Sequence, residues 1–373
     1  MWKLHNTFIW EDLRQDFDFV KDMEGVVQDK EYHAEGDVEI HTKMVLTELI
    51  KMEEFLSLDK QKQEILKASA LMHDIEKRST TIIDENARVS SKNHAKKGAK
   101  TVFSLLYKTI KTPFEIRNEI CNLVKYHGRP IWLFEKENSE KELIKISLEV
   151  NTELLYILAK ADVLGRISKD KNEILDKVEL FKEFAIEQKC FGKKYEFLSA
   201  KSKFNYFNKE NSYINYIPFE SDDDFTVLLM SAMPGSGKDY FIGHNYPDLP
   251  TVSLDDIRRK MKISPKDKKN NGKVVQFANE EARKYLRKKE SFIWNATNLT
   301  FDLRAKLIKL FTDYNAIVKI IYIEVNYKKL IEQNHNREYP VPATIMKGFL
   351  RKLEVPSLSE AHFVEYVVEK NGC

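Results

Sequence analysis

The chain has 373 residues, of which 42% are hydrophobic and 32% charged, a composition that excludes a fibrous or disordered protein and predicts two domains or three. The net charge of +3 is too small for a global basic field, so any contact with nucleic acid requires local basic surface. The three cysteines, Cys121, Cys190 and Cys373, are far apart, which argues against a disulfide framework. The N-terminus has no apolar leader, and the sequence has no long apolar run, which argues against a membrane partner. We therefore expect a cytoplasmic protein.

Two patterns follow each other along the chain. Apolar residues recur at helical spacing from Trp10 to Leu198, which predicts an all-α domain over residues 1–210. Short β-branched runs then alternate with helical segments, which predicts an α/β domain with a parallel sheet over residues 220–373. The expected strands are FTVLLM, LPTVSL, SFIWNA and AIVKIIYIEV. The basic run KISPKDKKNNGK, residues 262–273, is either a solvated loop or a loop that contacts phosphate.

The helical region places polar residues where apolar ones are expected. His73 and Asp74 interrupt the apolar helix of KASALMHDIEK, and burying such a pair is costly unless it is paired or bound to a metal. One buried histidine is most simply a satisfied core residue, but several in one domain indicate a common site. The other positions of this kind are His41, His94, His127 and Asp162. Imidazoles with shared carboxylates favour a transition metal over Mg²⁺ or Ca²⁺.

The order of these residues resembles the HD phosphohydrolase superfamily, with its pattern H…HD…H…H…D. The resemblance implies that His41, the His73–Asp74 pair and Asp162 hold one divalent metal such as Mn, Ni, Co, Cu or Fe. It also implies that His94 and His127 help to hold a second metal, with Asp74 bridging the two.

Three further residues follow from the same resemblance. Lys77, one turn after His73, and Arg166, one turn after Asp162, are expected to bind the phosphate of the substrate. The stretch YHAEGDVEIH resembles openings of HD-family domains and makes His33 either a substrate contact or an alternative first ligand.

The α/β region begins with a phosphate-binding loop. The strand FTVLLM runs into SAMPGSGKDYF, where small residues let backbone N–H groups approach phosphates at the start of a helix. Asp239 takes the place of the usual Ser or Thr, so it either offers a carboxylate to Mg²⁺ or repels phosphate. The residues expected to contact the phosphates of an NTP are Pro234, Gly235, Ser236, Gly237, Lys238, Asp239 and Tyr240.

The segments after this loop resemble the polynucleotide 5′-kinase family. In SLDDIRRK the resemblance makes Asp255 the general base for a 5′-hydroxyl and Arg258 the ligand of the phosphate on its 3′ side, whereas a capping aspartate and a solvated arginine are the simpler alternative. In WNATNLTFDLR it makes Arg304 a contact for nucleic acid, with Asn295 where the family has Asp.

The last motif of this resemblance is LIEQNHNREYPVPATIMKGFLRKLEVP, which is similar to the family's lid helix. It implies that Arg337 reaches the β- and γ-phosphates of the donor and that Gln333 is a second lid candidate.

The two halves together resemble bacterial enzymes that join an HD domain to a polynucleotide kinase and heal broken nucleic acid ends. The resemblance implies ATP or another NTP with Mg²⁺ for the kinase, RNA or DNA ends as substrates and a separate ligase as a partner. Two alternatives remain open: a nucleotide hydrolase whose P-loop domain phosphorylates a small metabolite, and a P-loop domain that only senses nucleotide.

Overall fold

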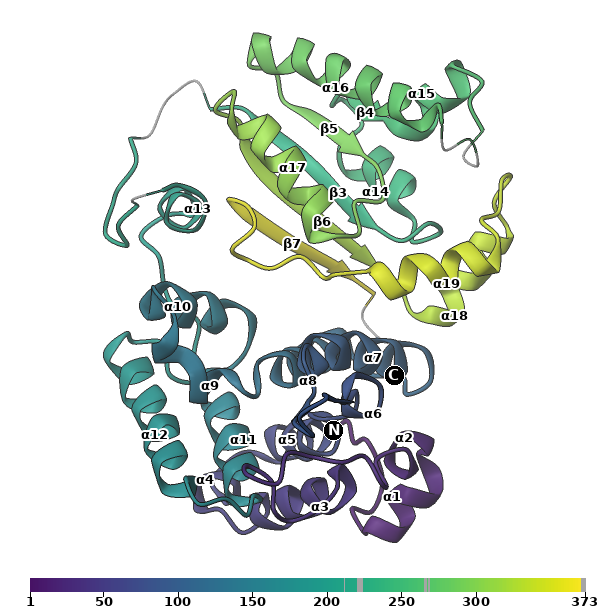
Figure 1. Ribbon diagram of the computed structural model, residues 1–373. Coiled ribbons are helices and arrows are strands. Elements are labelled where there is room, and N and C mark those ends of the chain that lie inside the picture. Colours follow the sequence, from purple (N-terminus) through teal and green to yellow (C-terminus); the bar gives the residue numbers. More distant parts are fainter. Residues whose placement is uncertain (211, 220–223, 265–266, 268, 370–373) are drawn as a thin grey trace. The chain divides into compact units, whose positions relative to one another are not determined.

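The structure is a computed structural model that describes residues 1–210, 212–219, 224–264, 267 and 269–369 (Figure 1). The chain divides into two compact units, Met1–Glu196 and Phe197–Cys373. This division lies ahead of the expected interval of residues 210–220 because helix α13 (Ala200–Asn208) packs within the second unit: the ring of Phe204 stacks on His362 with centroids 4.1 Å apart. Parts of the basic run 262–273, at residues 265–266 and 268, lie outside the described residues.

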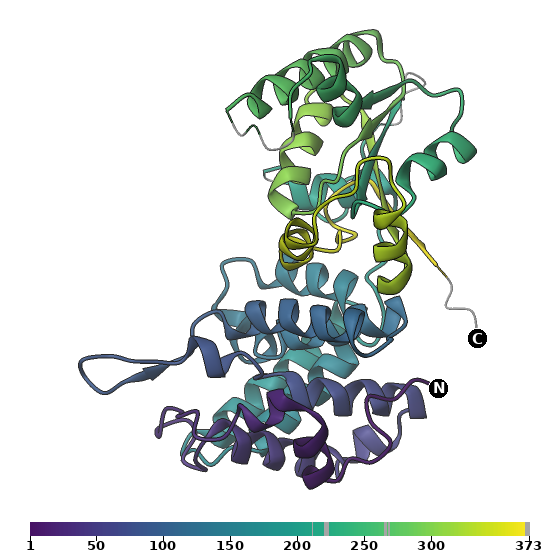
Figure 2. The same ribbon diagram turned by 90° about the vertical axis from the view of Figure 1, so that its right-hand side faces the viewer.

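The first unit is helical. Its helices in chain order are α1 (Trp10–Asp16), α2 (Asp18–Lys21), α3 (Val38–Leu49), α4 (Glu53–Leu56), α5 (Lys60–Met72), α6 (Lys77–Thr80), α7 (His94–Lys108), α8 (Phe114–Tyr126), α9 (Arg129–Trp132), the 3-10 helix η1 (Leu133–Glu135), α10 (Ser139–Glu149), α11 (Thr152–Leu164) and α12 (Lys171–Glu187). A short antiparallel hairpin of β1 (Ile82–Ile83) and β2 (Val89–Ser90), which was not expected, projects from the helices (Figure 2).

The second unit is built on a parallel sheet. Its elements after α13 are β3 (Thr226–Ala232), α14 (Lys238–Asn245), β4 (Thr251–Ser253), α15 (Leu254–Lys260), α16 (Asn271–Lys288), β5 (Phe292–Asn295), α17 (Phe301–Thr312), β6 (Ile317–Glu324), α18 (Tyr327–His335), α19 (Ala343–Lys352) and β7 (Phe363–Val368). The sheet has the strand order β4-β5-β3-β6-β7, and every neighbouring pair is parallel.

Alternation along the central strand β3 explains why helices cover both faces of this sheet. Val227 and Leu229 join a core with residues of α16 and α17, whereas Leu228 and Met230 point to the opposite core, which includes residues of α14 (Figure 1). The expected architecture, a helical domain followed by an α/β domain with a parallel sheet, is confirmed. The edge strand β7 was missed, although its sequence FVEYVV has the β-branched and aromatic content of a strand.

Two smaller observations complete the fold. Cys121 and Cys190 are buried and form no disulfide bond within the described residues, and Cys373 lies outside them. Within the described part of the chain, none of the helices combines the length and the apolar character that a membrane crossing demands.

Candidate metal centre and phosphate-binding loop

The polar residues of the helical unit converge from five helices. His41 lies in α3, His73 and Asp74 follow α5, His94 begins α7, His127 follows α8, and Asp162 lies in the last turns of α11. All of them except His94 are at least 95% buried.

Two glycines bring these helices close together. A Cβ on Gly165, at the end of α11, would lie 2.7 Å from the backbone nitrogen of Val45 in α3, so α11 can approach α3 only without a side chain there. A Cβ on Gly98 in α7 would lie 3.3 Å from Val124 in α8. The first contact holds Asp162 against His41, and the second contact lies between the helices that carry His94 and His127.

Hydrogen bonds at Nδ1 fix how three of the histidine rings are turned. Nδ1 of His73 donates to the carbonyl of Ala70 at 2.7 Å, and His127 and His94 make the same contact with carbonyls three residues earlier at 2.8 and 2.7 Å. A ring that donates from Nδ1 leaves the lone pair of Nε2 free to bind a metal.

The Nε2 atoms and the carboxylates form two adjoining groups. In the first, Nε2 of His41 lies 3.0 Å from Oδ1 of Asp162, 3.4 Å from Nε2 of His73 and 3.8 Å from Oδ2 of Asp74. In the second, Nε2 of His94 and of His127 lie 3.2 and 3.8 Å from Oδ1 of Asp74. The two oxygens of Asp74 therefore face different groups, as a bridging carboxylate requires.

The chemistry of this donor set fits a pair of divalent transition metals. Among the described residues, Oδ1 of Asp74 is buried without a hydrogen bond. Nε2 of His94 and Nε2 of His127 are 3.3 Å apart although both rings donate from Nδ1, so two lone pairs meet unless a cation lies between them. Burial lowers the pKa of His127 to about 3, which keeps its imidazole neutral.

Cations next to the carboxylates keep them ionised. Burial opposes the charge of Asp74 and Asp162, but Lys77 and Arg166 respectively hold the pKa of each well below its usual range. Nζ of Lys77 lies 2.7 Å from Oδ2 of Asp74, and Arg166 forms a two-point ion pair with Asp162. These two residues, expected to bind phosphate, thus lie beside the two carboxylates of the cluster.

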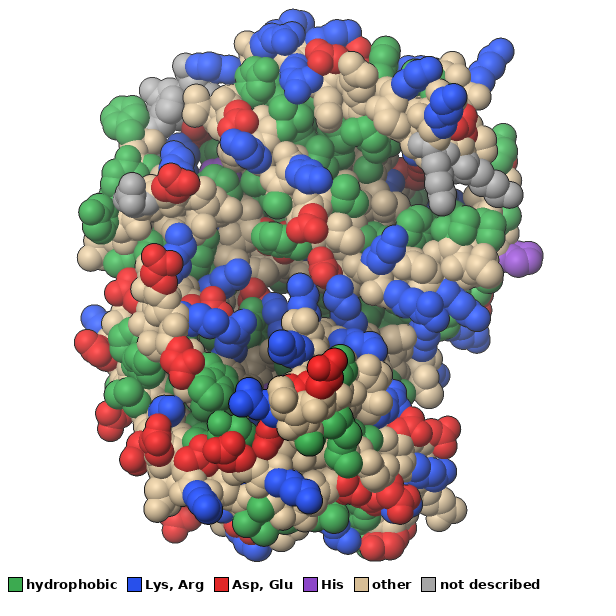
Figure 3. Space-filling view, in the orientation of Figure 1, with side chains coloured by type: hydrophobic (Ala, Val, Ile, Leu, Met, Phe, Trp, Pro, Cys, Tyr) green, Lys and Arg blue, Asp and Glu red, His purple; other side chains and the backbone are tan. Residues whose placement is uncertain are grey.

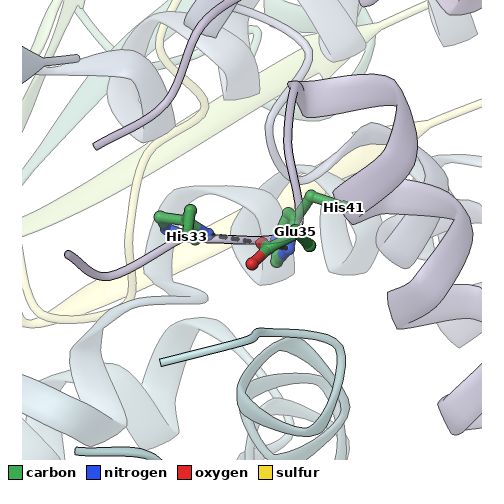
Figure 4. Close-up of side chains that lie close together, drawn as sticks. All are labelled: His33, Glu35 and His41. Carbon is green, nitrogen blue, oxygen red and sulfur yellow. Dashed lines mark hydrogen bonds and ion pairs between the residues drawn. The ribbon is translucent and has the colours of Figure 1, made fainter. Parts of the chain in front are cut away.

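The sequence did not single out Glu35, which joins two of the expected histidines (Figure 4). Its Oε1 lies 2.8 Å from Nδ1 of His33 and 2.8 Å from Nδ1 of His41, and its other oxygen accepts from the backbone N–H of Ile167. Burial opposes the charge of this fully buried side chain, but the contacts with His33, His41 and the N–H of Ile167 lower its pKa. His41, and not His33, has its Nε2 among the other ligands. The HxE spacing was the available signal, because a carboxylate often orients a metal-binding histidine.

The second unit forms the expected loop between β3 and α14. Gly235 and Gly237 have φ angles of +86° and +84°, a conformation that favours glycine. A Cβ on Gly235 would lie 3.0 Å from the carbonyl of Leu330, so the loop packs directly on α18. Ser236 is 4% exposed, and its Oγ has no hydrogen-bond partner within the described residues. Tyr240, by contrast, is 78% exposed on α14.

The first residues of α14 meet the end of β5. Nζ of Lys238 donates to Oδ1 of Asn295 and lies 3.0 Å from Oδ1 of Asp239. Nδ2 of Asn295 donates to the same oxygen of Asp239 at 2.8 Å. Burial opposes the charge of Asp239, but Lys238, this amide and Arg337 lower its pKa.

The expected acceptor residues follow the neighbouring strand. Ser253, at the end of β4, pairs in register with Asn295 of β5, so both strands end at the edge that carries the loop. Asp255 lies two residues after Ser253, and its Oδ1 accepts a hydrogen bond from Nη1 of Arg258 at 2.8 Å. The Asp255 side chain is 64% exposed and open to a substrate.

The remaining expected residues have different positions. Arg337 follows α18 and is half-buried, and Oε1 of Gln333 is buried without a hydrogen bond in the described part of the chain. Arg304 is a correction: it is fully buried, pairs with Glu360 and donates to the carbonyls of Asn298 and Glu354. These contacts give Arg304 a structural role in place of the expected contact with nucleic acid.

Two family models match the parts of the chain that carry these sites. The HD domain family matches residues 38–167, and the AAA domain family matches residues 227–356. A candidate kinase from Chloroflexus aurantiacus, known from a crystal structure, is 15% identical with a TM-score of 0.34 over 40% of this chain and 87% of that one. The search of curated proteins gives no match. The chain therefore joins an HD domain, which carries a buried cluster of His and Asp side chains, to a P-loop domain of the AAA type.

Proposed function

We propose that the protein heals broken nucleic acid ends with two active sites. The P-loop domain transfers the γ-phosphate of an NTP to a 5′-hydroxyl, and the HD domain removes 2′,3′-cyclic, 2′- or 3′-phosphates. The observation that carries the proposal is the Asp255–Arg258 pair in α15, directly after β4, on the sheet edge of the phosphate loop. An arginine beside the base is most useful when the acceptor carries its own phosphate, as a strand does.

The kinase step needs few groups beyond those at this edge. The 5′-oxygen forms a bond to the γ-phosphorus while the bond to the bridging oxygen breaks, and the hydroxyl proton passes to the carboxylate of Asp255. Lys238 and Arg337 supply positive charge to the phosphates of the donor, and Mg²⁺ with the NTP adds further charge when bound.

The surface of α18 and α19 has a basic character that favours a polyanionic substrate. The segment from Tyr327 to Lys352, which spans α18 and α19, contains six Lys or Arg residues and two Glu residues, a net charge of +4. Lys and Arg side chains gather over these helices (Figure 3). Such a surface binds phosphates through charge, with little preference for sequence.

The HD step uses the residues around the metal site. A divalent transition metal held by the His and Asp residues supplies Lewis acidity toward the phosphate oxygens. Lys77 and Arg166 neutralise the phosphate charge. The Nδ1 proton of His33 is directed to Glu35, so its Nε2 is left to accept a proton from the attacking water. The water oxygen bonds to phosphorus while the ester bond to the ribose oxygen breaks, and His33 then passes the proton to that leaving oxygen.

The two activities do not oppose each other, because they act on opposite ends of a break. A ligase needs a 5′-phosphate on one end and a free 3′-hydroxyl on the other. The P-loop domain would produce the 5′-phosphate and the HD domain the free 3′-hydroxyl. A separate ligase would then join the two ends.

The kinase assignment is tested with γ-labelled ATP, Mg²⁺ and a strand with a 5′-hydroxyl. We expect the wild-type protein and Asp256→Ala to label the strand and Asp255→Ala to lose labelling. Asp256 is the matched control because it lies next to Asp255 but pairs with Arg259. An unlabelled strand with the wild-type protein, or full labelling by Asp255→Ala, would overturn the assignment in favour of a small acceptor or a nucleotide sensor.

A further inference from the structure

The start of α14 and the end of β5 carry an unusual pair of side chains. P-loop proteins that use Mg²⁺ generally place a Ser or Thr hydroxyl after the loop lysine and a carboxylate on a neighbouring strand. Here the carboxylate, Asp239, follows Lys238, and the neutral residue, Asn295, ends the strand. The number of carboxylates is the same in both arrangements, but their positions are exchanged.

The contacts between the two residues show that they form a unit. All the contacts found among the described residues go to one oxygen of Asp239, Oδ1, which accepts from Nδ2 of Asn295 at 2.8 Å and lies 3.0 Å from Nζ of Lys238. Within that part of the chain Oδ2 makes no hydrogen bond, and the side chain is 73% exposed.

The strand side of the pair is rigid. Asn295 is 8% exposed, and β5 is hydrogen-bonded to the central strand β3. An aspartate in its place would set two carboxylates about 3 Å apart, an arrangement that forces one of them to bind a proton. The amide instead orients Asp239 while adding no charge.

The loop itself provides an independent sign of a ligand-binding site. Ser236 is 96% buried, and its Oγ has no partner within the described residues. A buried hydroxyl without a partner in a phosphate loop is satisfied when an anion or its hydration shell enters.

We propose that Asp239 supplies the carboxylate for the Mg²⁺ of the nucleotide and that Asn295 positions it, so that the two residues exchange the roles usual in P-loops. Oδ1 stays with the amide, and Oδ2 would be available to hold the ion, directly or through water. The inference rests on the proposed use of NTP by this domain but requires no strand.

Binding of a fluorescent ATP analogue with and without Mg²⁺ tests the inference in the full chain. We expect Mg²⁺ to increase the affinity of the wild-type protein for the ATP analogue. In Asp239→Asn we expect this Mg²⁺-dependent increase to be about tenfold smaller. Asp248→Asn, which makes the same charge change at an exposed position, should keep it. Asn295→Asp should lose part of the gain, and Asp239→Ser with Asn295→Asp should recover it.

The outcomes separate this inference from the proposed function. Wild-type binding without any Mg²⁺ effect, an unchanged effect in Asp239→Asn, or a double variant no better than Asn295→Asp would overturn the exchange of roles. Asp239→Asn keeps this test decisive even if substitution of the buried Asn295 weakens folding. Mg²⁺-dependent binding without phosphorylation of a strand would leave the exchange standing and refute the kinase assignment alone.

Discussion

Glu35 offers the sharpest test of how the metal centre is built. Its Oε1 lies 2.8 Å from both His33 and His41, while its Oε2 accepts from the backbone N–H of Ile167. In Glu35→Gln the amide oxygen can replace only one of these two acceptors. The NH₂ group then faces either the histidines or the N–H of Ile167, and a donor meets a donor.

The magnitude follows from this loss. Removing a carboxylate that orients a metal-binding histidine weakens metal affinity by about 10- to 100-fold. We therefore expect Glu35→Gln to bind Mn²⁺ about 10- to 100-fold more weakly, measured by calorimetric titration of the metal-stripped full chain. Glu31→Gln, on an exposed neighbour, should bind as the wild type does. Unchanged Mn²⁺ affinity in a folded Glu35→Gln protein would refute the positioning role.

Three further predictions concern stability. Gly165→Ala should lower the free energy of unfolding by about 1–3 kcal/mol in urea titrations, because its methyl group would overlap α3, whereas Gly128→Ala, with open space around it, should change little. Arg304→Ala should lower the free energy of unfolding by about 3–5 kcal/mol because Glu360 is left buried without its partner. A stable variant that binds the strand more weakly would instead support a contact between Arg304 and nucleic acid. Burial raises the pKa of Glu119 to about 7 from 4.5, so the folded state binds more protons between these values and stability should fall as pH rises through this window. Glu119→Gln should remove about 2–3 kcal/mol of that fall, and an equal pH dependence in the variant would contradict the assignment.

The sequence was most informative where chemistry follows local pattern. The alternation of β-branched runs with helices predicted the parallel sheet, and the glycines of the loop predicted its turn. The buried histidines could be recognised because His73 and His127 continue the apolar stripes of α5 and α8 at the ends of these helices. Each of these signals lies within one element and its neighbours.

The parts that the sequence did not reveal depend on partners far along the chain. Arg304 is buried because Glu360, 56 residues later, neutralises it. Asp239 and Asn295 are 56 residues apart, and only the sheet shows that Asn295 donates a hydrogen bond to Asp239 at 2.8 Å. Glu35 lies two residues after His33 in sequence, but only the fold shows that it also holds His41.

One substrate tests the central claim, that two independent sites act on opposite ends of a strand. An oligonucleotide with a 5′-hydroxyl and a 2′,3′-cyclic phosphate is incubated with ATP, Mg²⁺ and Mn²⁺, and both ends are identified by mass spectrometry. We predict that the wild-type protein converts both ends, that Asp74→Asn converts only the 5′ end, and that Asp255→Ala converts only the other. Loss of both conversions in either folded variant, or an unchanged strand with the wild-type protein, would contradict the account.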